Sequence, residues 1–119
     1  APAFVQAGAL QALAEDPYQF KERRAALQAR AGELLAGLKH FPGLLVPPPT
    51  GGMYVFLRIR GEQDSVATAL RLIDEAGLGL APGSAFGAAG EGWLRWCFAS
   101  RPERLADGLD RFGRWLRHR

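Results

Sequence analysis

The chain has 119 residues, of which 48% are hydrophobic and 23% charged, the size and balance of one globular domain rather than of a disordered or fibrous protein. Its net charge of +3 is carried almost wholly by arginine, because Lys21 and Lys39 are the only lysines. No apolar run approaches the roughly 20 residues of a membrane span, and the first residues do not have the pattern expected of a signal peptide. Cys97 is the single cysteine, so no internal disulfide can form. We therefore expect a cytoplasmic protein without a membrane partner, and we interpret Cys97 as a small core residue.

Two helices are predicted for the first forty residues. In the first, four apolar side chains share one face: Val5, Ala9, Ala12 and Leu13. Asp16 before Pro17 joins a good N-cap to a good first helical residue, so the second helix should begin there. It should end near His40, because the following proline and glycine cannot continue it. Its predicted apolar stripe consists of Phe20, Leu27, Ala31, Leu34 and Leu38.

After residue 43, short strands alternate with helices. Four segments rich in apolar, β-branched or aromatic residues are predicted as strands: 44–46, 53–59, 78–81 and 93–99. A helix should begin at Ser65 as its cap and end at Gly77 in the left-handed conformation. Another should follow the capping box formed by Ser100 and Glu103. The predicted fold class is α+β: a small mixed or antiparallel sheet of three to four strands covered by helices, with a long N-terminal helical segment.

Both later helices carry apolar residues at helical spacing. The predicted buried stripe of the helix after Ser65 is Val66, Ala69, Leu70 and Ile73. That of the last helix is Leu105, Leu109, Phe112 and Leu116. The last helix ends in a basic run: Arg111, Arg114, Arg117, His118 and Arg119. Because cations suit the negative end of a helix dipole, we interpret this run as a solvated helix end and expect no nucleic-acid partner.

Arg95 does not fit a purely apolar strand. Side chains alternate along a strand, so one side of segment 93–99 is a core face: Leu94, Trp96 and Phe98. The other side places Arg95 between Trp93 and Cys97. Its guanidinium can hold a ligand carboxylate through two parallel hydrogen bonds, or it can reach solvent at a sheet edge or pair with Asp64 or Glu62. The chemistry of the residues alone favours the second interpretation.

Two glycine-rich loops adjoin these strands. Residues 51–52 close a proline-rich segment, and residues 83–92 follow the strand at 78–81. Neither loop has the G-x-G-x-x-G spacing or the P-loop spacing that cradles a phosphate, so both are interpreted as turns. The second loop is long for a hairpin connection, which favours a loop that lines a site.

Three motifs, in this order, resemble the C-terminal part of class I/II aminotransferases, pyridoxal-phosphate enzymes of fold type I. They are GGMY at residues 51–54, LAPGSAFG at 80–87 and GWLRWCFA at 92–99. Arg23-Arg24 followed by Leu27 is a further pattern typical of that family's long helix. The resemblance runs over nearly the whole chain and implies that residues 1–119 are the small C-terminal domain, a fragment of a longer protein.

The resemblance also implies a site. The family's last-strand arginine binds the substrate α-carboxylate, which places that role on Arg95, with Gly51, Gly52, Ser84 and Phe86 as candidates for lining the approach. The family's Schiff-base lysine and cofactor-holding residues lie upstream, so no catalytic, cofactor-binding or metal-binding residue is assigned in this segment. The parent protein would use pyridoxal 5'-phosphate, take an amino acid and a 2-oxo acid, and form a homodimer. The fragment alone should bind no cofactor and be inactive.

Alternatives stay open. Carbon–sulfur lyases and aminotransferase-like transcription regulators share this domain and differ only in upstream regions. A ferredoxin-like regulatory module that binds amino acids is a different class, because strand, helix, strand, strand and helix follow one another from residue 53 onward. The long N-terminal helix has no place in such a module.

Overall fold

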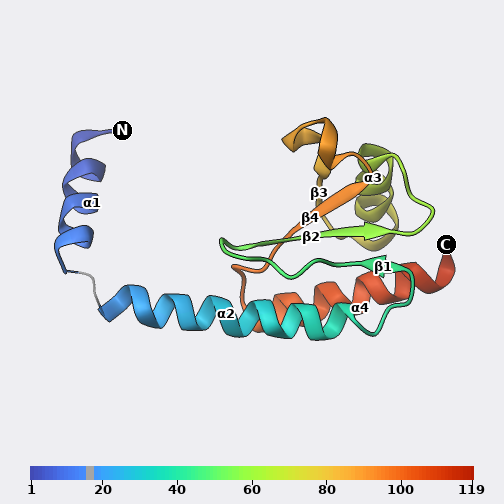
Figure 1. Ribbon diagram of the computed structural model, residues 1–119, viewed down its shortest axis with the longest axis horizontal. Helices are drawn as coiled ribbons and strands as arrows, with labels where there is room; N and C mark the ends of the chain where they lie inside the picture. Colours follow the sequence, from blue (N-terminus) through green and yellow to red (C-terminus); the bar gives the residue numbers. More distant parts are fainter. Residues whose placement is uncertain (16–17) are drawn as a thin grey trace.

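The computed structural model describes residues 1–15 and 18–119 (Figure 1). The described helices are α1 (Ala3–Glu15), α2 (Tyr18–Leu38), α3 (Ser65–Ala76) and α4 (Pro102–His118). The strands are β1 (Leu44–Leu45), β2 (Tyr54–Ile59), β3 (Ala81–Pro82) and β4 (Trp93–Cys97), with 3-10 turns η1 (Gly83–Phe86) and η2 (Ala88–Gly90) between the last two. The predicted cap at Asp16 and Pro17 lies outside the described residues.

The strands form one antiparallel sheet in the order β1-β2-β4-β3, which confirms the predicted α+β class. The long pair β2 and β4 lies at its centre. The strand predicted over 78–81 is displaced to Ala81–Pro82, because the N–H of Leu78 is already bonded to the carbonyl of Leu72 in the cap of α3. Pro82 has no N–H to offer a further strand, and this suits its place in a short edge strand.

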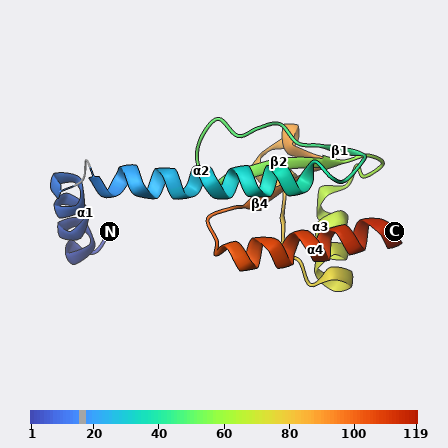
Figure 2. The same cartoon turned by 90° about the horizontal axis from the view of Figure 1, so that it is seen from below.

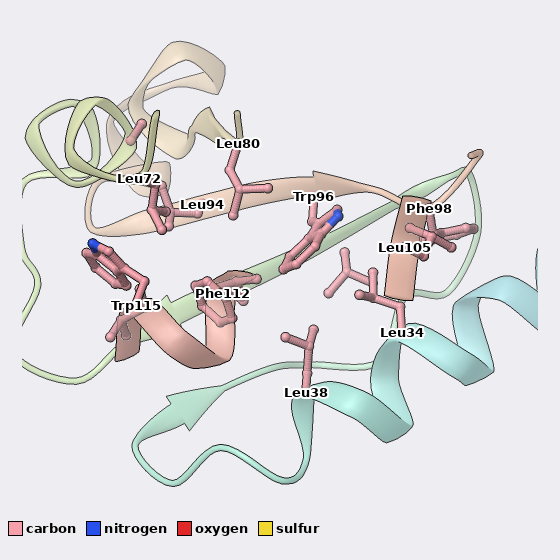
Figure 3. Close-up of a cluster of buried hydrophobic side chains, with 14 residues drawn as sticks. Leu34, Leu38, Leu72, Leu80, Leu94, Trp96, Phe98, Leu105, Phe112 and Trp115 are labelled. Carbon is pink, nitrogen blue, oxygen red and sulfur yellow. The ribbon is translucent and has the colours of Figure 1, made fainter. Parts of the chain in front are cut away.

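The core lies on one face of the sheet (Figure 3). Val55, Leu57 and Ile59 of β2 and Leu94 and Trp96 of β4 point into it. The helices α2, α3 and α4 contribute the other side of the cluster: Leu34, Leu38, Ala69, Leu72, Leu105, Phe112 and Trp115. Alternation along the two central strands therefore divides the sheet into a covered face and a face that these helices leave open.

The N-terminal part of the molecule stands away from this core (Figures 1 and 2). The helix α1 has no buried residue, and Leu10 and Leu13 are 70% and 82% exposed. In α2, a helix about 31 Å long, Leu34 and Leu38 are buried as predicted, whereas Phe20 is exposed. The radius of gyration is 16.7 Å, compared with about 13.5 Å for a compact domain of this length. Among the described residues, none of the helices combines the length and apolar character needed to cross a membrane.

The helix α3 turns a different face inward from the one predicted. Its buried residues are Ser65, Thr68, Ala69 and Leu72. Of the predicted stripe only Ala69 is buried, while Val66, Leu70 and Ile73 are about half exposed. Ser65 and Thr68 can be buried because their hydroxyls are hydrogen-bonded: Ser65 donates to the Ser84 hydroxyl at 2.8 Å, and Thr68 donates to the Asp64 carbonyl at 2.7 Å. The carboxylate of Asp64 caps the helix at the N–H of Ala67. The left-handed end at Gly77 (φ 61°) is confirmed.

The helix α4 begins differently from its prediction. Its N-cap is Arg101, without a side-chain hydrogen bond, so the predicted capping box of Ser100 and Glu103 is wrong. The N–H of Ser100 instead donates to the Phe98 carbonyl at 2.8 Å, within the turn that leaves β4. Pro102 needs no hydrogen-bond partner for its nitrogen at the first helical position. The predicted stripe is confirmed, with Leu105 and Phe112 buried and the other two leucines partly buried, and it gains Trp115.

Candidate functional site

The open face of β4 carries Arg95. Leu94 and Trp96 point into the core, whereas Trp93 and Arg95 are half-buried on the other side, which confirms the predicted alternation. Cys97 shares the open face and is exposed, so its interpretation as a core residue is wrong. The reason is that Cys97, like Trp93 and Arg95, lies on the side of β4 that faces away from the three core helices.

Two aromatic rings flank the Arg95 guanidinium. Its Cζ atom lies 4.0 Å from the ring centroid of Tyr54 and 3.8 Å from that of Phe86. Tyr54 comes from β2, where the antiparallel register pairs it with Cys97 and pairs Phe56 with Arg95. Phe86 comes from η1 and also meets Phe56 edge to face, with centroids 6.0 Å apart. Cation–π attraction to two rings fixes a charge that is partly withdrawn from water.

No acidic residue neutralises Arg95 within the described part of the chain. Neither a hydrogen bond nor an ion pair from its guanidinium is present among those residues. Asp64, which could have paired with it, caps α3 instead. The ring contacts consume none of the five N–H donors of an arginine, so these donors remain available to a ligand. A carboxylate is the group that an arginine fork fits best.

Glu62, the other suggested partner, is committed elsewhere. Its carboxylate contacts Arg71 at 2.6 Å and Arg119 at 3.0 Å, and it accepts a hydrogen bond from Thr68. Burial alone would raise the pKa of Glu62, but hydrogen bonds from Arg71 and Thr68 and the charges of both arginines outweigh it and lower the pKa. The arrangement therefore contradicts an Arg95–Glu62 pair.

The four candidate lining residues have different surroundings. Phe86 contacts Arg95 directly. Ser84 is held by Ser65, whose hydroxyl donates to the Ser84 Oγ at 2.8 Å. Gly51 and Gly52 form the exposed turn that precedes β2, and Gly52 has a left-handed φ of 71°. Neither glycine is shown in contact with Arg95, but Tyr54, whose ring contacts it, follows Gly52 by two residues.

Sequence reasoning missed the role of Tyr54 at this site. The signal was nonetheless present: in an antiparallel pair, side chains at alternate positions of two neighbouring strands gather on one face. Tyr54 and Phe56 alternate with the core residues Val55 and Leu57, so they belong to the face of Arg95. The register of the two strands was the missing information.

A hollow of the described surface lies elsewhere, between the C-terminal ends of α3 and α4. Its volume is about 610 Å³, and it is lined by Glu75, Ala76, Arg111, Arg114, Trp115 and His118. The Trp115 indole N–H donates to Glu75 at 2.6 Å, and both arginines pair with an aspartate one turn earlier in α4. Both arginines of this hollow are thus paired with an acid, whereas Arg95 has no acidic partner among the described residues.

Comparison with known proteins gives aminotransferases both by sequence and by structure. An aspartate aminotransferase of Pyrococcus horikoshii is 32% identical over 116 residues, covering 95% of this chain and 30% of that protein. An aromatic aminotransferase of Pyrococcus horikoshii superposes with a TM-score of 0.83 at 34% identity, covering 97% of this chain and 31% of the other. An alanine aminotransferase from Pyrococcus furiosus also gives 0.83, at 27% identity, covering 91% of this chain and 28% of the other. No family model matches the chain.

The relatives found by sequence and those found by structure are aminotransferases, and this chain matches one part of each. The chain belongs with the fold-type I aminotransferases and corresponds to the C-terminal part of such a protein. It spans less than a third of the length of the relatives named above.

Proposed function

We propose that residues 1–119 are the small C-terminal domain of a pyridoxal-phosphate-dependent aminotransferase and that Arg95 binds the α-carboxylate of its substrates. The observation that carries the proposal is a half-buried guanidinium, placed over two rings, with no acidic partner among the described residues. A cation that is partly withdrawn from water and has no acidic partner destabilises the protein unless a ligand supplies the compensating negative charge. Gly51, Gly52 and Ser84 would shape the approach through the backbone.

One arginine can serve both halves of an amino transfer. An amino acid gives up its amino group and becomes a 2-oxo acid, and a second 2-oxo acid then accepts that group. Both kinds of substrate carry a carboxylate next to the reacting carbon, so Arg95 would hold each of them in turn. Holding the carboxylate at a fixed place orients the reacting carbon, and orientation of this kind lowers the barrier. The related enzymes are named for aspartate, aromatic amino acids and alanine, which share this carboxylate and differ beyond it.

The cofactor does not fit within this chain alone. Pyridoxal phosphate supplies the electron sink for such chemistry and needs a lysine to anchor it. Lys21 is exposed on α2 and Lys39 is exposed directly after it. The helix α2 packs on the covered face through Leu34 and Leu38, whereas Arg95 is on the open face. We therefore assign the anchoring lysine to the rest of the parent protein, together with its homodimer contacts.

Replacing Arg95 by alanine in the full-length enzyme tests the proposal. Two charge-assisted hydrogen bonds, each worth about 1.5–3 kcal/mol, would be lost, so KM for both the amino acid and the 2-oxo acid should rise by about 100- to 10,000-fold. Steady-state kinetics with each substrate varied in turn measures this.

Arg58→Ala is the matched control. Arg58 is an exposed arginine on the same face of β2, and it lies alongside Gly92 rather than over the two rings. Its removal should leave both KM values within about twofold, a surface effect. Equal KM values for the Arg95→Ala variant and the unmodified enzyme would remove Arg95 from this role.

A further inference from the structure

The ring of Phe86 reaches Arg95 from a loop and not from the sheet. Phe86 ends η1, is 49% exposed, and contacts the Arg95 guanidinium and the Phe56 ring. Tyr54, the other ring, is fixed by the β2–β4 ladder. The position of Phe86 therefore depends on whatever holds the loop between β3 and β4.

The loop is folded tightly on itself at two glycines. A Cβ added to Gly83 would lie 2.2 Å from the carbonyl oxygen of Gly90, and one added to Gly90 would lie 2.1 Å from that of Gly83. Neither position accepts a side chain without moving the backbone. The turns η1 and η2 thus form one compact unit, and an anchor at any point of it acts on Phe86.

Ser65, the first residue of α3, anchors this unit at two points. Its hydroxyl donates to the Ser84 hydroxyl at 2.8 Å and accepts from the Ser84 N–H at 3.3 Å. Its own N–H donates to the Glu91 carboxylate at 2.7 Å, and the same oxygen accepts from the Gly92 N–H at 3.0 Å. Ser65 is 1% exposed, so it offers a rigid attachment point.

Glu91 accepts these two hydrogen bonds as an ionised carboxylate. Its side chain is exposed, yet the hydrogen bonds from the N–H groups of Ser65 and then Gly92 lower its pKa. A negative charge also suits the N-terminus of α3. The contact therefore persists at neutral pH as a charge-assisted bond.

We propose that Glu91 and Ser65 are positioning residues for Arg95, because they hold the η1–η2 unit where Phe86 covers the guanidinium. A guanidinium confined before the substrate arrives loses less conformational freedom on binding its carboxylate. The structural half of this proposal stands by itself, and its consequence for substrate binding rests on the function proposed for Arg95.

The structural half is tested in the 119-residue chain by NMR. The ring of Phe86 should displace the Arg95 Nε–H resonance through its ring current, and Glu91→Ala should move that resonance toward its value in Phe86→Ala. Glu91→Gln keeps an acceptor oxygen and should move it less. Glu103→Ala is the matched control, because Glu103 is an exposed glutamate in the first turn of α4 and should leave the resonance in place.

An unchanged Arg95 resonance in a folded Glu91→Ala chain would overturn the proposal. If that variant does not fold, as judged by far-UV circular dichroism, Ser84→Ala takes its place, since it removes the hydroxyl that receives the Ser65 bond. A shift in Ser84→Ala supports the anchor, and no shift contradicts it.

In the full-length enzyme, Glu91→Ala should raise KM for the amino acid by about 3- to 10-fold and leave kcat within twofold, and Glu91→Gln should restore part of the loss. A fall in kcat with an unchanged KM would contradict a positioning role. The two failures are distinguishable. Unchanged KM values in the Arg95→Ala variant would contradict the proposed function without altering the NMR result. An unmoved Arg95 resonance in Glu91→Ala would contradict the positioning role of Glu91, whatever Arg95 binds.

Discussion

Glu62 joins distant parts of the chain by charge. It lies between β2 and α3, and its two oxygens hold Arg71 of α3 and Arg119 at the end of the chain. Its side chain is only 20% exposed, so its partners are screened less than those of the surface pairs within α4. The two cations explain why its pKa is low despite burial.

This lowered pKa predicts how stability depends on pH. A carboxyl group whose pKa is lower in the folded than in the unfolded chain stabilises the fold above its ordinary pKa of about 4.5, and this contribution is lost as the pH falls through the lower, folded value. Glu62→Gln should therefore be less stable than the unmodified chain at pH 7, and the difference should shrink on acidification below about 4.5. Urea unfolding of both chains across this range measures it, and a difference that grows at low pH would contradict the assignment.

The helix α2 has two halves with different roles. Its C-terminal half inserts Leu34 and Leu38 into the core, both at most 1% exposed. Its N-terminal half extends past the sheet, and α1 lies beyond it without a buried side chain (Figure 1). The apolar side chains of α1 and that of Phe20 in the first turn of α2 are not buried against other described residues, so the core ends within α2.

A pair of leucine substitutions measures this division. Leu34→Ala should lower the free energy of unfolding by about 2–5 kcal/mol, because it removes buried methyl groups and leaves a cavity. Leu10→Ala, at a position 70% exposed, should change it by less than about 0.5 kcal/mol. Chemical denaturation of the 119-residue chain gives both values. A comparable loss in the two variants would show that α1 packs onto the core in solution.

At the scale of the whole molecule, one face of the sheet is built and the other is left open. Three helices close the covered face around Phe112 and Trp96, while Tyr54, Phe86 and Arg95 remain accessible on the open face. On the function proposed for Arg95, this open face would be one part of a larger active site, in keeping with a chain that spans less than a third of its relatives.

The 119-residue chain alone should therefore not catalyse amino transfer. With pyridoxal phosphate, an amino acid and a 2-oxo acid added, its rate should equal that of the same mixture without protein, because the only lysines are exposed and lie on or directly after α2. Production of the new amino acid, followed by chromatography, measures this. Turnover that requires the chain and disappears in Lys21→Met or Lys39→Met would contradict it.

Local chemistry determined much of this protein before any packing was known. Period-two alternation divided β4 into its two faces, Gly77 ended α3, and the motif order indicated the family. These features follow from residues close together in the chain, so their geometry is the same wherever the segment lies.

Only the tertiary structure decided which surfaces are covered and which charges are paired. The predicted stripe of α3 was wrong because the helix buries the face of Ser65, Thr68 and Leu72, where the Ser65 hydroxyl bonds Ser84 in a loop distant along the chain. Cys97 is exposed because the core helices α2, α3 and α4 pack on the other face of the sheet. Arg95 has no acidic partner among the described residues because both suggested acids bind other groups, and for Glu62 these groups come from distant parts of the chain. Burial and pairing are properties of neighbours in space, and neighbours in space are what a linear pattern leaves undetermined.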